Sequence, residues 1–252
     1  MDGVMRKLWK ILAVLLGVLI VVLIANVAAS LNARRATEDA RAALVSGDGV
    51  VVEEGEWITL RPEGKLPATG LILFPGAYVE AAAYAPIARL IAARGFLVVL
   101  VKPPFSIALL DEEAPAEVMA AYPEVARWAV GGHSLGGVSA AHFAFVHPNA
   151  ADALVLWAAG PSRLDDLSGR DLPVLGIYGS RDGVYPLELV PILRDLVPPD
   201  AQLVELNGGN HAQFGSYGDG TQGGDLLPSI SRAEQERQVA DLTAGFLELL
   251  PP

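Results

Sequence analysis

The chain has 252 residues, 52% of them hydrophobic, and a formal net charge of −11. This length suffices for one sizeable domain with an appendage, and the acidic balance argues against a nucleic-acid partner and against electrostatic docking on anionic lipid. Because the chain has no cysteine, disulfides, thiolate metal sites and a cysteine nucleophile are excluded.

The N-terminus combines a basic tail, residues 1–10, with an uncharged apolar run, residues 11–29. A run of this length can span a bilayer as a helix, so we predict a transmembrane segment with the membrane as its partner. Three basic residues precede the run and three follow it, but the short tail favours a signal-anchor that places the following domain outside the cytoplasm. The small residues 27–29 resemble a cleavage site and make a secreted protein the alternative.

The remainder divides into a linker, residues 30–49, and one domain, residues 50–252. The linker is expected to continue the preceding helix and to end in a turn at residues 46–49. Short or apolar runs predict strands at residues 50–52, 57–60, 71–74, 97–101, 128–130, 154–157, 173–178 and 202–206. Apolar residues at helical spacing predict helices at residues 84–94, 115–121, from near Val138, 187–196 and 231–249.

Strands that alternate with helices indicate an α/β fold with a doubly wound, mostly parallel sheet. In such sheets ligands bind beyond the carboxyl ends of the strands. Only about 15 residues, 158–172, separate two of the predicted strands, so no large lid domain is expected over a site at this edge.

The stretch Gly132-His133-Ser134-Leu135-Gly136 lies between a predicted strand and a predicted helix. This Gly-x-Ser-x-Gly pattern is typical of a sharp strand-to-helix turn that exposes a nucleophilic serine. The flanking glycines keep neighbouring side chains away from the turn. Ser134 is therefore the predicted nucleophile.

A serine nucleophile needs a histidine to accept its proton and an acid to orient that histidine. Asp182 and His211 each follow a predicted buried strand, and with Ser134 they occur in the chain order serine, acid, histidine. Their strand-end positions allow the three to converge at one edge of the sheet. Asp165 and Asp166 follow the preceding strand and are the reserve candidates for the acid.

Ester chemistry also needs N–H groups directed at the developing oxyanion. The residue after the nucleophile, Leu135, supplies the first predicted donor. The second is expected from the loop after the strand at residues 71–74, and we assign it to Ala77, with Gly76 or Tyr78 as alternatives.

The other histidines are interpreted as structural. His133 directly precedes the nucleophile and is expected to pack under neighbouring loops, while His142 and His147 fall within and at the end of the following helix. None of them has the spacing of a metal site, so we predict neither a metal nor another cofactor.

Taken together, four motifs resemble the alpha/beta hydrolase fold-5 family, which is related in architecture to dienelactone hydrolases. They are residues 74–76, 131–137, 178–183 and 209–218, within a resemblance that runs from about residue 71 to about residue 249. The resemblance implies an α/β-hydrolase fold, with Ser134 as nucleophile, Asp182 as acid and His211 as base. It does not imply a substrate.

The glycine-rich loop after His211, residues 211–225, carries Phe214 and Tyr217. These aromatic residues, together with Tyr78, are the candidates for substrate binding in an acyl pocket. The competing interpretation is a surface loop that only positions His211.

The sequence therefore favours a serine hydrolase of the carboxylesterase type that cleaves small or accessible acyl esters through an acyl-enzyme on Ser134. Acyl transfer to another alcohol, or peptide hydrolysis, with the same three residues is an alternative. A non-catalytic binding protein of the same fold is the alternative from a different class, and the presence of all three residues disfavours it. The oligomeric state does not follow from the sequence.

Overall fold

The computed structural model describes residues 5, 9, 12–13, 15–22, 34–64 and 66–250. Its centre is one eight-stranded sheet with the strand order β1-β2-β4-β3-β5-β6-β7-β8. The strands are β1 (Val50–Glu54), β2 (Ile58–Pro62), β3 (Thr69–Phe74), β4 (Leu97–Leu100), β5 (Arg127–His133), β6 (Ala153–Trp157), β7 (Val174–Gly179) and β8 (Gln202–Leu206). β1 and β2 form an antiparallel hairpin, and β3 to β8 are parallel.

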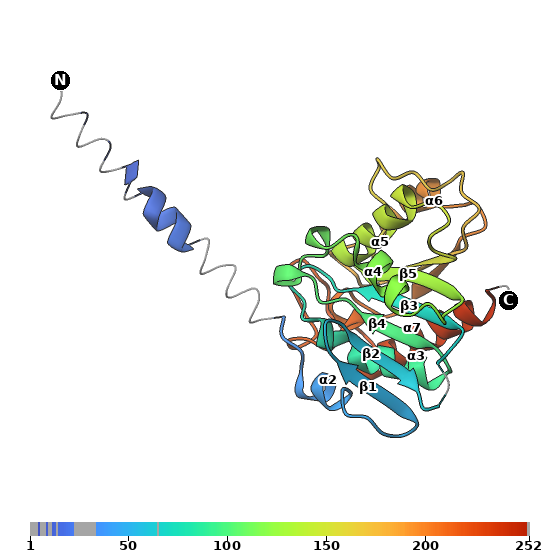
Figure 1. The fold of residues 1–252 in the computed structure, drawn as a ribbon. Coiled ribbons are helices and arrows are strands. Elements are labelled where there is room, and N and C mark those ends of the chain that lie inside the picture. The colour runs from blue at the N-terminus through green and yellow to red at the C-terminus, as the bar shows by residue number, and fades with distance from the viewer. Residues whose placement is uncertain are drawn as a thin grey trace.

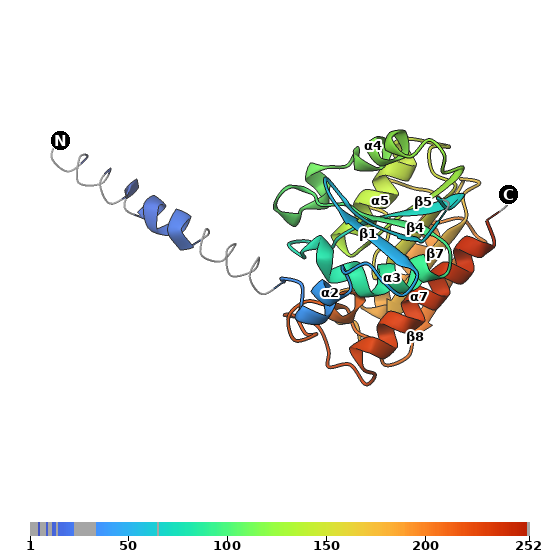
Figure 2. The same ribbon diagram turned by 60° about the horizontal axis from the view of Figure 1, so that its bottom comes forward.

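Helices cover both faces of the sheet (Figures 1 and 2). The α-helices are α2 (Glu38–Ala42), α3 (Ala85–Ala93), α4 (Ala114–Ala121), α5 (Leu135–Val146), α6 (Val190–Leu196) and α7 (Arg232–Glu248). Short 3-10 helices lie at η1 (Ala81–Tyr84), η2 (Pro104–Ser106), η3 (Ala108–Leu110), η4 (Leu187–Leu189) and η5 (Ala212–Phe214). The predicted doubly wound, mostly parallel sheet is thus confirmed.

Two hydrophobic cores form because the central strands are buried on both faces. One core contains Ile87 from α3 and Val239 from α7, and the other contains Val118 from α4 and Phe143 from α5. The continuous apolar runs of the sequence reflect this double burial. Residues 158–173, between β6 and β7, form no helix or strand, in line with the expected lack of a lid domain there.

The N-terminal part differs from the predicted helical linker. Residues 34–37 are not helical, and Ala36 instead pairs with Tyr217 in an isolated antiparallel bridge. Thr37 then caps the five-residue helix α2 through its side chain, which accepts from the Ala40 N–H. Tertiary contacts with the domain therefore replace the helix that the alanine-rich sequence favours.

The predicted membrane span, residues 11–29, is described only in part. Residues 12, 13 and 15–22 are helical, and the other residues of the predicted span lie outside the described residues. Within the described ranges, no helix has both the length and the apolar character needed to cross a bilayer.

Candidate active site

Ser134 occupies the sharp turn between β5 and α5. Its backbone angles are φ 53° and ψ −123°, a conformation that residues other than glycine rarely adopt. The helix begins directly at Leu135, three residues earlier than expected near Val138. The serine therefore stands at the carboxyl end of a central strand and at the N-terminus of a helix.

Two glycines make this turn sterically feasible. A Cβ atom at Gly132 would lie 2.3 Å from the carbonyl carbon of Gly136, and one at Gly136 would lie 2.4 Å from the Pro75 carbonyl oxygen. Both distances are shorter than any real Cβ contact. The turn consequently lies directly against the end of β3, where the loop with the second predicted oxyanion donor begins.

Asp182 and His211 meet in a buried hydrogen bond. His211 Nδ1 lies 2.8 Å from Asp182 Oδ2, and both side chains are almost completely buried. Because a carboxylate only accepts, Nδ1 carries the proton and Nε2 of the neutral ring is an acceptor. The other Asp182 oxygen accepts from the backbone N–H groups of Val184 and Tyr185, which fix the carboxylate.

The reserve acids lie elsewhere. Asp165 accepts from the Ser162 hydroxyl and contacts His142 Nδ1 at 3.0 Å. Asp166 is exposed, and hydrogen bonds from the Ser168 side chain and from the Ser168 backbone N–H lower the pKa of its carboxyl. Asp182 is therefore the acid that the structure brings to His211.

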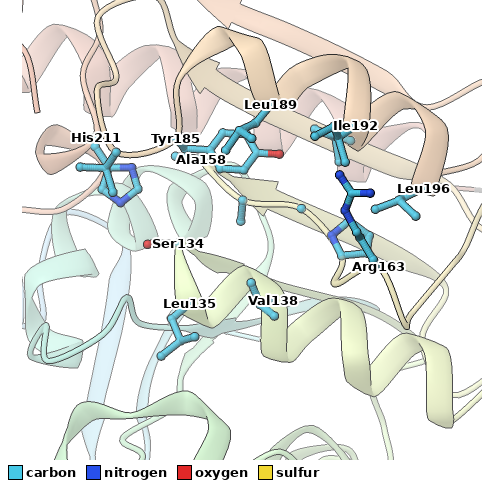
Figure 3. A pocket seen from close by; sticks show the side chains of 15 residues that line it. Ser134, Leu135, Val138, Ala158, Arg163, Tyr185, Leu189, Ile192, Leu196 and His211 are labelled. Carbon is cyan, nitrogen blue, oxygen red and sulfur yellow. The ribbon is translucent and has the colours of Figure 1, made fainter. Parts of the chain in front are cut away.

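Ser134 and His211 border the same cavity, which has a volume of about 470 Å³. Figure 3 shows them at one end of it, with α5 and α6 on opposite sides and Arg163 at the far end. The other lining residues are mostly apolar: Leu135, Val138, Ala158, Ala159, Gly160, Pro161, Val184, Tyr185, Leu189, Ile192, Leu193 and Leu196. No hydrogen bond joins Ser134 to His211 in the described structure. Hydrogen bonds between catalytic residues are often long or poorly aligned before a substrate binds.

The N–H groups after β3 can be assigned one by one. Gly76 donates to the Tyr84 hydroxyl oxygen, and Tyr78 donates to the Ser106 carbonyl oxygen. The N–H of Ala77 donates to no acceptor within the described residues, and the same holds for Leu135. Of the three residues considered for the second donor, only Ala77 thus has an uncommitted N–H group.

His133 is buried beside His211 without facing the cavity lining. The Tyr84 hydroxyl accepts from Gly76, so we assign its proton to His133 Nδ1, 2.8 Å away. The two histidine ring centres are 4.5 Å apart, and the Phe214 ring stacks on His133. Burial, together with the nearby His211 and Arg34, holds the pKa of His133 well below its usual value, so this ring is neutral.

Asp225 is a residue of this site that the sequence did not reveal. Its carboxylate accepts from the backbone N–H groups of His211, Ala212 and Gly183. It therefore links the loop that begins at His211 (the histidine loop) to the loop that carries Asp182 (the acid loop). Asp225 is one of two acidic residues in the glycine-rich stretch 211–225, and no local pattern separates it from Asp219. Such a residue also suits an ordinary turn.

The aromatic residues proposed for substrate binding do not line the cavity. Phe214 and Tyr217 are 0% and 1% exposed and belong to the hydrophobic core beside α3 and α7, so their prediction as an acyl wall was wrong. Tyr78 is half-buried and borders a separate depression with Arg35 and Glu80. The glycine-rich loop positions His211 instead: the Asn210 side chain holds the loop carbonyls of Gly220 and Leu226.

The remaining histidines lie beside acidic side chains. His142 lies near Asp165 and Glu112, and His147 lies near Glu113. In the described part of the chain, no group of three or more histidine and acidic side chains could hold a metal ion.

The chain was compared with known protein families, curated proteins and solved structures. The model of the alpha/beta hydrolase family matches residues 70–237. A search among curated proteins found no match by sequence. Two similar solved structures are a novel esterase from Mycobacterium tuberculosis (TM-score 0.58, 17% identity, covering 84% of this chain and 95% of that one) and a predicted CIB-like hydrolase from Thermoplasma acidophilum (TM-score 0.55, 16% identity, covering 78% and 100%).

At these identities the two structures show a common fold and nothing further. The family match carries more weight, because it extends from the start of β3 into α7 and includes the serine turn, the acid loop and the histidine loop. This chain therefore belongs to the alpha/beta hydrolase family, and the protein is a hydrolase.

Proposed function

We propose that the protein is a serine hydrolase of the carboxylesterase type, with Ser134 as nucleophile, His211 as general base and Asp182 as the acid that orients it. The observation that carries this proposal is the buried Asp182–His211 hydrogen bond at one end of an apolar cavity that Ser134 also borders. A carboxylate that fixes Nδ1–H leaves Nε2 free to accept the serine proton.

In the proposed reaction, Ser134 Oγ attacks the ester carbonyl carbon while His211 Nε2 takes the hydroxyl proton. The Leu135 and Ala77 N–H groups bind the oxyanion, a task that suits them because neither donates to an acceptor in the described part of the chain. When the tetrahedral intermediate collapses, His211 protonates the leaving alkoxide and the acyl group stays on Ser134. Water, deprotonated by His211, then releases the acid.

The volume and lining of the cavity favour an ester substrate with an apolar acyl or alcohol group of modest size. Its lining is mostly apolar and includes aliphatic side chains of α5 and α6, and burial together with the nearby Asp182 raises the pKa of the Tyr185 hydroxyl to about 12. Tyr185 therefore stays protonated at neutral pH and keeps a hydrogen-bond donor in the cavity wall. Short-chain esters fit such a site better than charged ones.

The test is turnover of a chain-length series of p-nitrophenyl esters by the wild type, Ser134→Ala and Ser139→Ala. Ser139 lies in α5, which begins directly after Ser134, and its buried hydroxyl has no hydrogen-bond partner among the described residues, so it is a matched control. We expect hydrolysis of short-chain esters by the wild type and Ser139→Ala, and a loss of at least about 10³-fold in Ser134→Ala. Unchanged turnover in Ser134→Ala would contradict the assignment.

We also propose that residues 11–29 hold the domain at a membrane, with the domain outside the cytoplasm. The uncharged run supports this, as do the exposed apolar side chains of the described helical residues, such as Leu15, Leu19 and Val21. Membrane fractions of cells that express the full chain should retain the protein after an alkaline carbonate wash. A soluble form whose N-terminus lies near Ser30 would indicate a cleaved signal peptide instead.

A further inference from the structure

Arg34 makes two hydrogen bonds to the loop that carries the predicted oxyanion donor, Ala77. Its guanidinium Nη1 donates to the Ala77 carbonyl oxygen at 2.6 Å, although the two residues are 43 positions apart. Its own carbonyl oxygen accepts from the Glu80 N–H at 3.1 Å. One residue from before β1 therefore holds two points of the loop that follows β3.

This loop needs external support because its backbone is strained. Tyr78 has φ 63°, in the left-handed region, which costs a residue other than glycine about 1 kcal/mol or more. Four of the five N–H groups at residues 76–80 donate to acceptors in the protein, and among the described residues the Ala77 N–H has none. The contacts on either side of Ala77 thus decide where its free N–H points.

The residues after Arg34 make further hydrogen bonds to the loops around the site. Ala36 N–H and the Arg41 guanidinium both bind the Glu80 carboxylate. Thr37 N–H donates to the carbonyl oxygen of Ser216, in the loop beyond His211. In Figures 1 and 2, α2 lies beside this orange loop. The segment therefore contacts the loops of both the oxyanion donor and the general base.

The Arg34 charge also reaches the buried groups of the site. Burial raises the pKa of Tyr84 and of Tyr217, and the positive charge of Arg34 opposes that rise in both. A charge that favours the anionic form of neighbouring hydroxyls also favours an oxyanion nearby.

We propose that Arg34 is a positioning residue for the reaction: by holding the Ala77 carbonyl, it fixes the loop so that the Ala77 N–H points at the oxyanion. The segment before β1 is then part of the catalytic apparatus and not a passive linker. This role rests on the proposed function, since it presupposes an oxyanion at Ser134. Arg34 lies outside the region that matches the family model, so it is a feature of this chain's N-terminal segment.

The experiment compares Arg34→Gln, Arg34→Lys and Arg35→Gln in the full-length protein. Arg35 is the neighbouring exposed arginine, and no hydrogen bond or ion pair involves its side chain in the described structure, so it is the matched control. The readouts are kcat and KM for p-nitrophenyl acetate and the inhibition constant of a trifluoromethyl ketone, which forms an oxyanion when the serine adds to it. All assays are run below the melting temperature of every variant.

We expect Arg34→Gln to lower kcat by about 10- to 100-fold with KM within about threefold of the wild type, because the lost contact matters most in the transition state. Affinity for the ketone should fall in parallel. Arg34→Lys should recover part of both losses, because an ammonium can donate one hydrogen bond to the Ala77 oxygen. Arg35→Gln should match the wild type.

A kcat for Arg34→Gln within twofold of the wild type, or an unchanged ketone affinity, would overturn the positioning role while leaving the proposed function intact. If Arg34→Gln does not fold, Arg34→Met, which has no side-chain donor, carries the test, and full wild-type kcat and ketone affinity in that variant would likewise overturn the role. A wild type without esterase activity would overturn the proposed function and this role with it.

Discussion

Two loops at the carboxyl edge of the sheet are held in place by different parts of the chain. The loop with His211 is fixed from within the domain, by the Asp225 carboxylate and by Gln235, whose side chain bonds both the N–H and the carbonyl of Asn210. The loop with Ala77 is held partly by Arg34, from before the first strand.

The difference separates contacts made within the region that matches the family model from a contact made by a residue before it. Asp225 and Gln235 lie inside the matched residues 70–237, whereas Arg34 lies outside them. The proposed general base is thus held by residues of the matched region. The proposed oxyanion donor is also held by a segment that connects the domain to the apolar N-terminal run.

The largest expected effect is the loss of kcat when Asp182, the hydrogen-bond partner of His211, is changed. Asp182→Asn should lower kcat by about 10⁴-fold, because an amide can donate to Nδ1 and so favour the wrong tautomer of His211. Steady-state hydrolysis of p-nitrophenyl acetate measures it. Asp165→Asn is the control, since Asp165 contacts His142 and not His211. Equal losses in both variants would contradict the assignment of the acid.

A smaller loss of kcat is expected when the hydrogen bonds from Asp225 to the loop with His211 are weakened. Asp225→Asn removes the charge that accepts the His211 and Ala212 N–H groups, and its NH2 group would oppose one of these donors. We expect kcat to fall about tenfold, because His211 shifts while its partner Asp182 remains. Asp219→Asn, an exposed change in the same loop, should leave kcat unaltered. A kcat for Asp225→Asn equal to that of Asp219→Asn would show that these hydrogen bonds are dispensable.

The loop with Ala77 is also supported from within the domain, by the Tyr84 hydroxyl among others, and removing that hydroxyl sharpens the comparison. Tyr84→Phe leaves the buried Gly76 N–H without its acceptor and should lower the free energy of unfolding by about 1–3 kcal/mol. Urea denaturation measures the change. Tyr122→Phe is the control, because the Tyr122 hydroxyl makes no hydrogen bond in the described structure. Identical stability of the two variants would mean that Tyr84 does not anchor the loop.

The smallest effect concerns the pH dependence of stability. His133 has a pKa well below 6.5 in the folded state, chiefly because it is buried, so the unfolded chain binds the extra proton as the pH falls below that value. Its contribution to stability is present above about pH 6.5 and is lost towards acid pH, by at most about 1.4 kcal/mol per pH unit.

Urea denaturation of the wild type and His133→Gln between pH 7.5 and pH 5 isolates this term, because the carboxylates contribute equally to both. The variant should show the shallower decline. Parallel declines would mean that His133 is protonated in the folded protein.

The sequence predicted the sheet because its strands are continuous apolar runs, and those runs are buried on both faces. It also predicted which residues stand at strand ends, and the structure brings Asp182 to His211 for that reason. The start of α5 was misplaced, because Gly136 and Gly137 are poor helix formers. Their use follows from close contacts with Pro75 and Ala159, which lie far away in the sequence.

Other features depend on contacts that no local pattern encodes. Phe214 and Tyr217 are in a glycine-rich loop that resembles a surface loop, yet both are core residues, because the loop folds back against α3 and α7. The roles of Asp225 and Arg34 rest on hydrogen bonds that span up to 43 residues. Arg34 in particular looked like one of several charges that flank an apolar run.

The most direct test of the central claim, that Ser134 is the nucleophile, is covalent labelling with a fluorophosphonate followed by peptide mass spectrometry. We predict one phosphonylated peptide from the wild type and from Ser139→Ala, with the adduct on Ser134, and no adduct in Ser134→Ala. Labelling that persists in Ser134→Ala, or a wild type that does not react, would contradict the account.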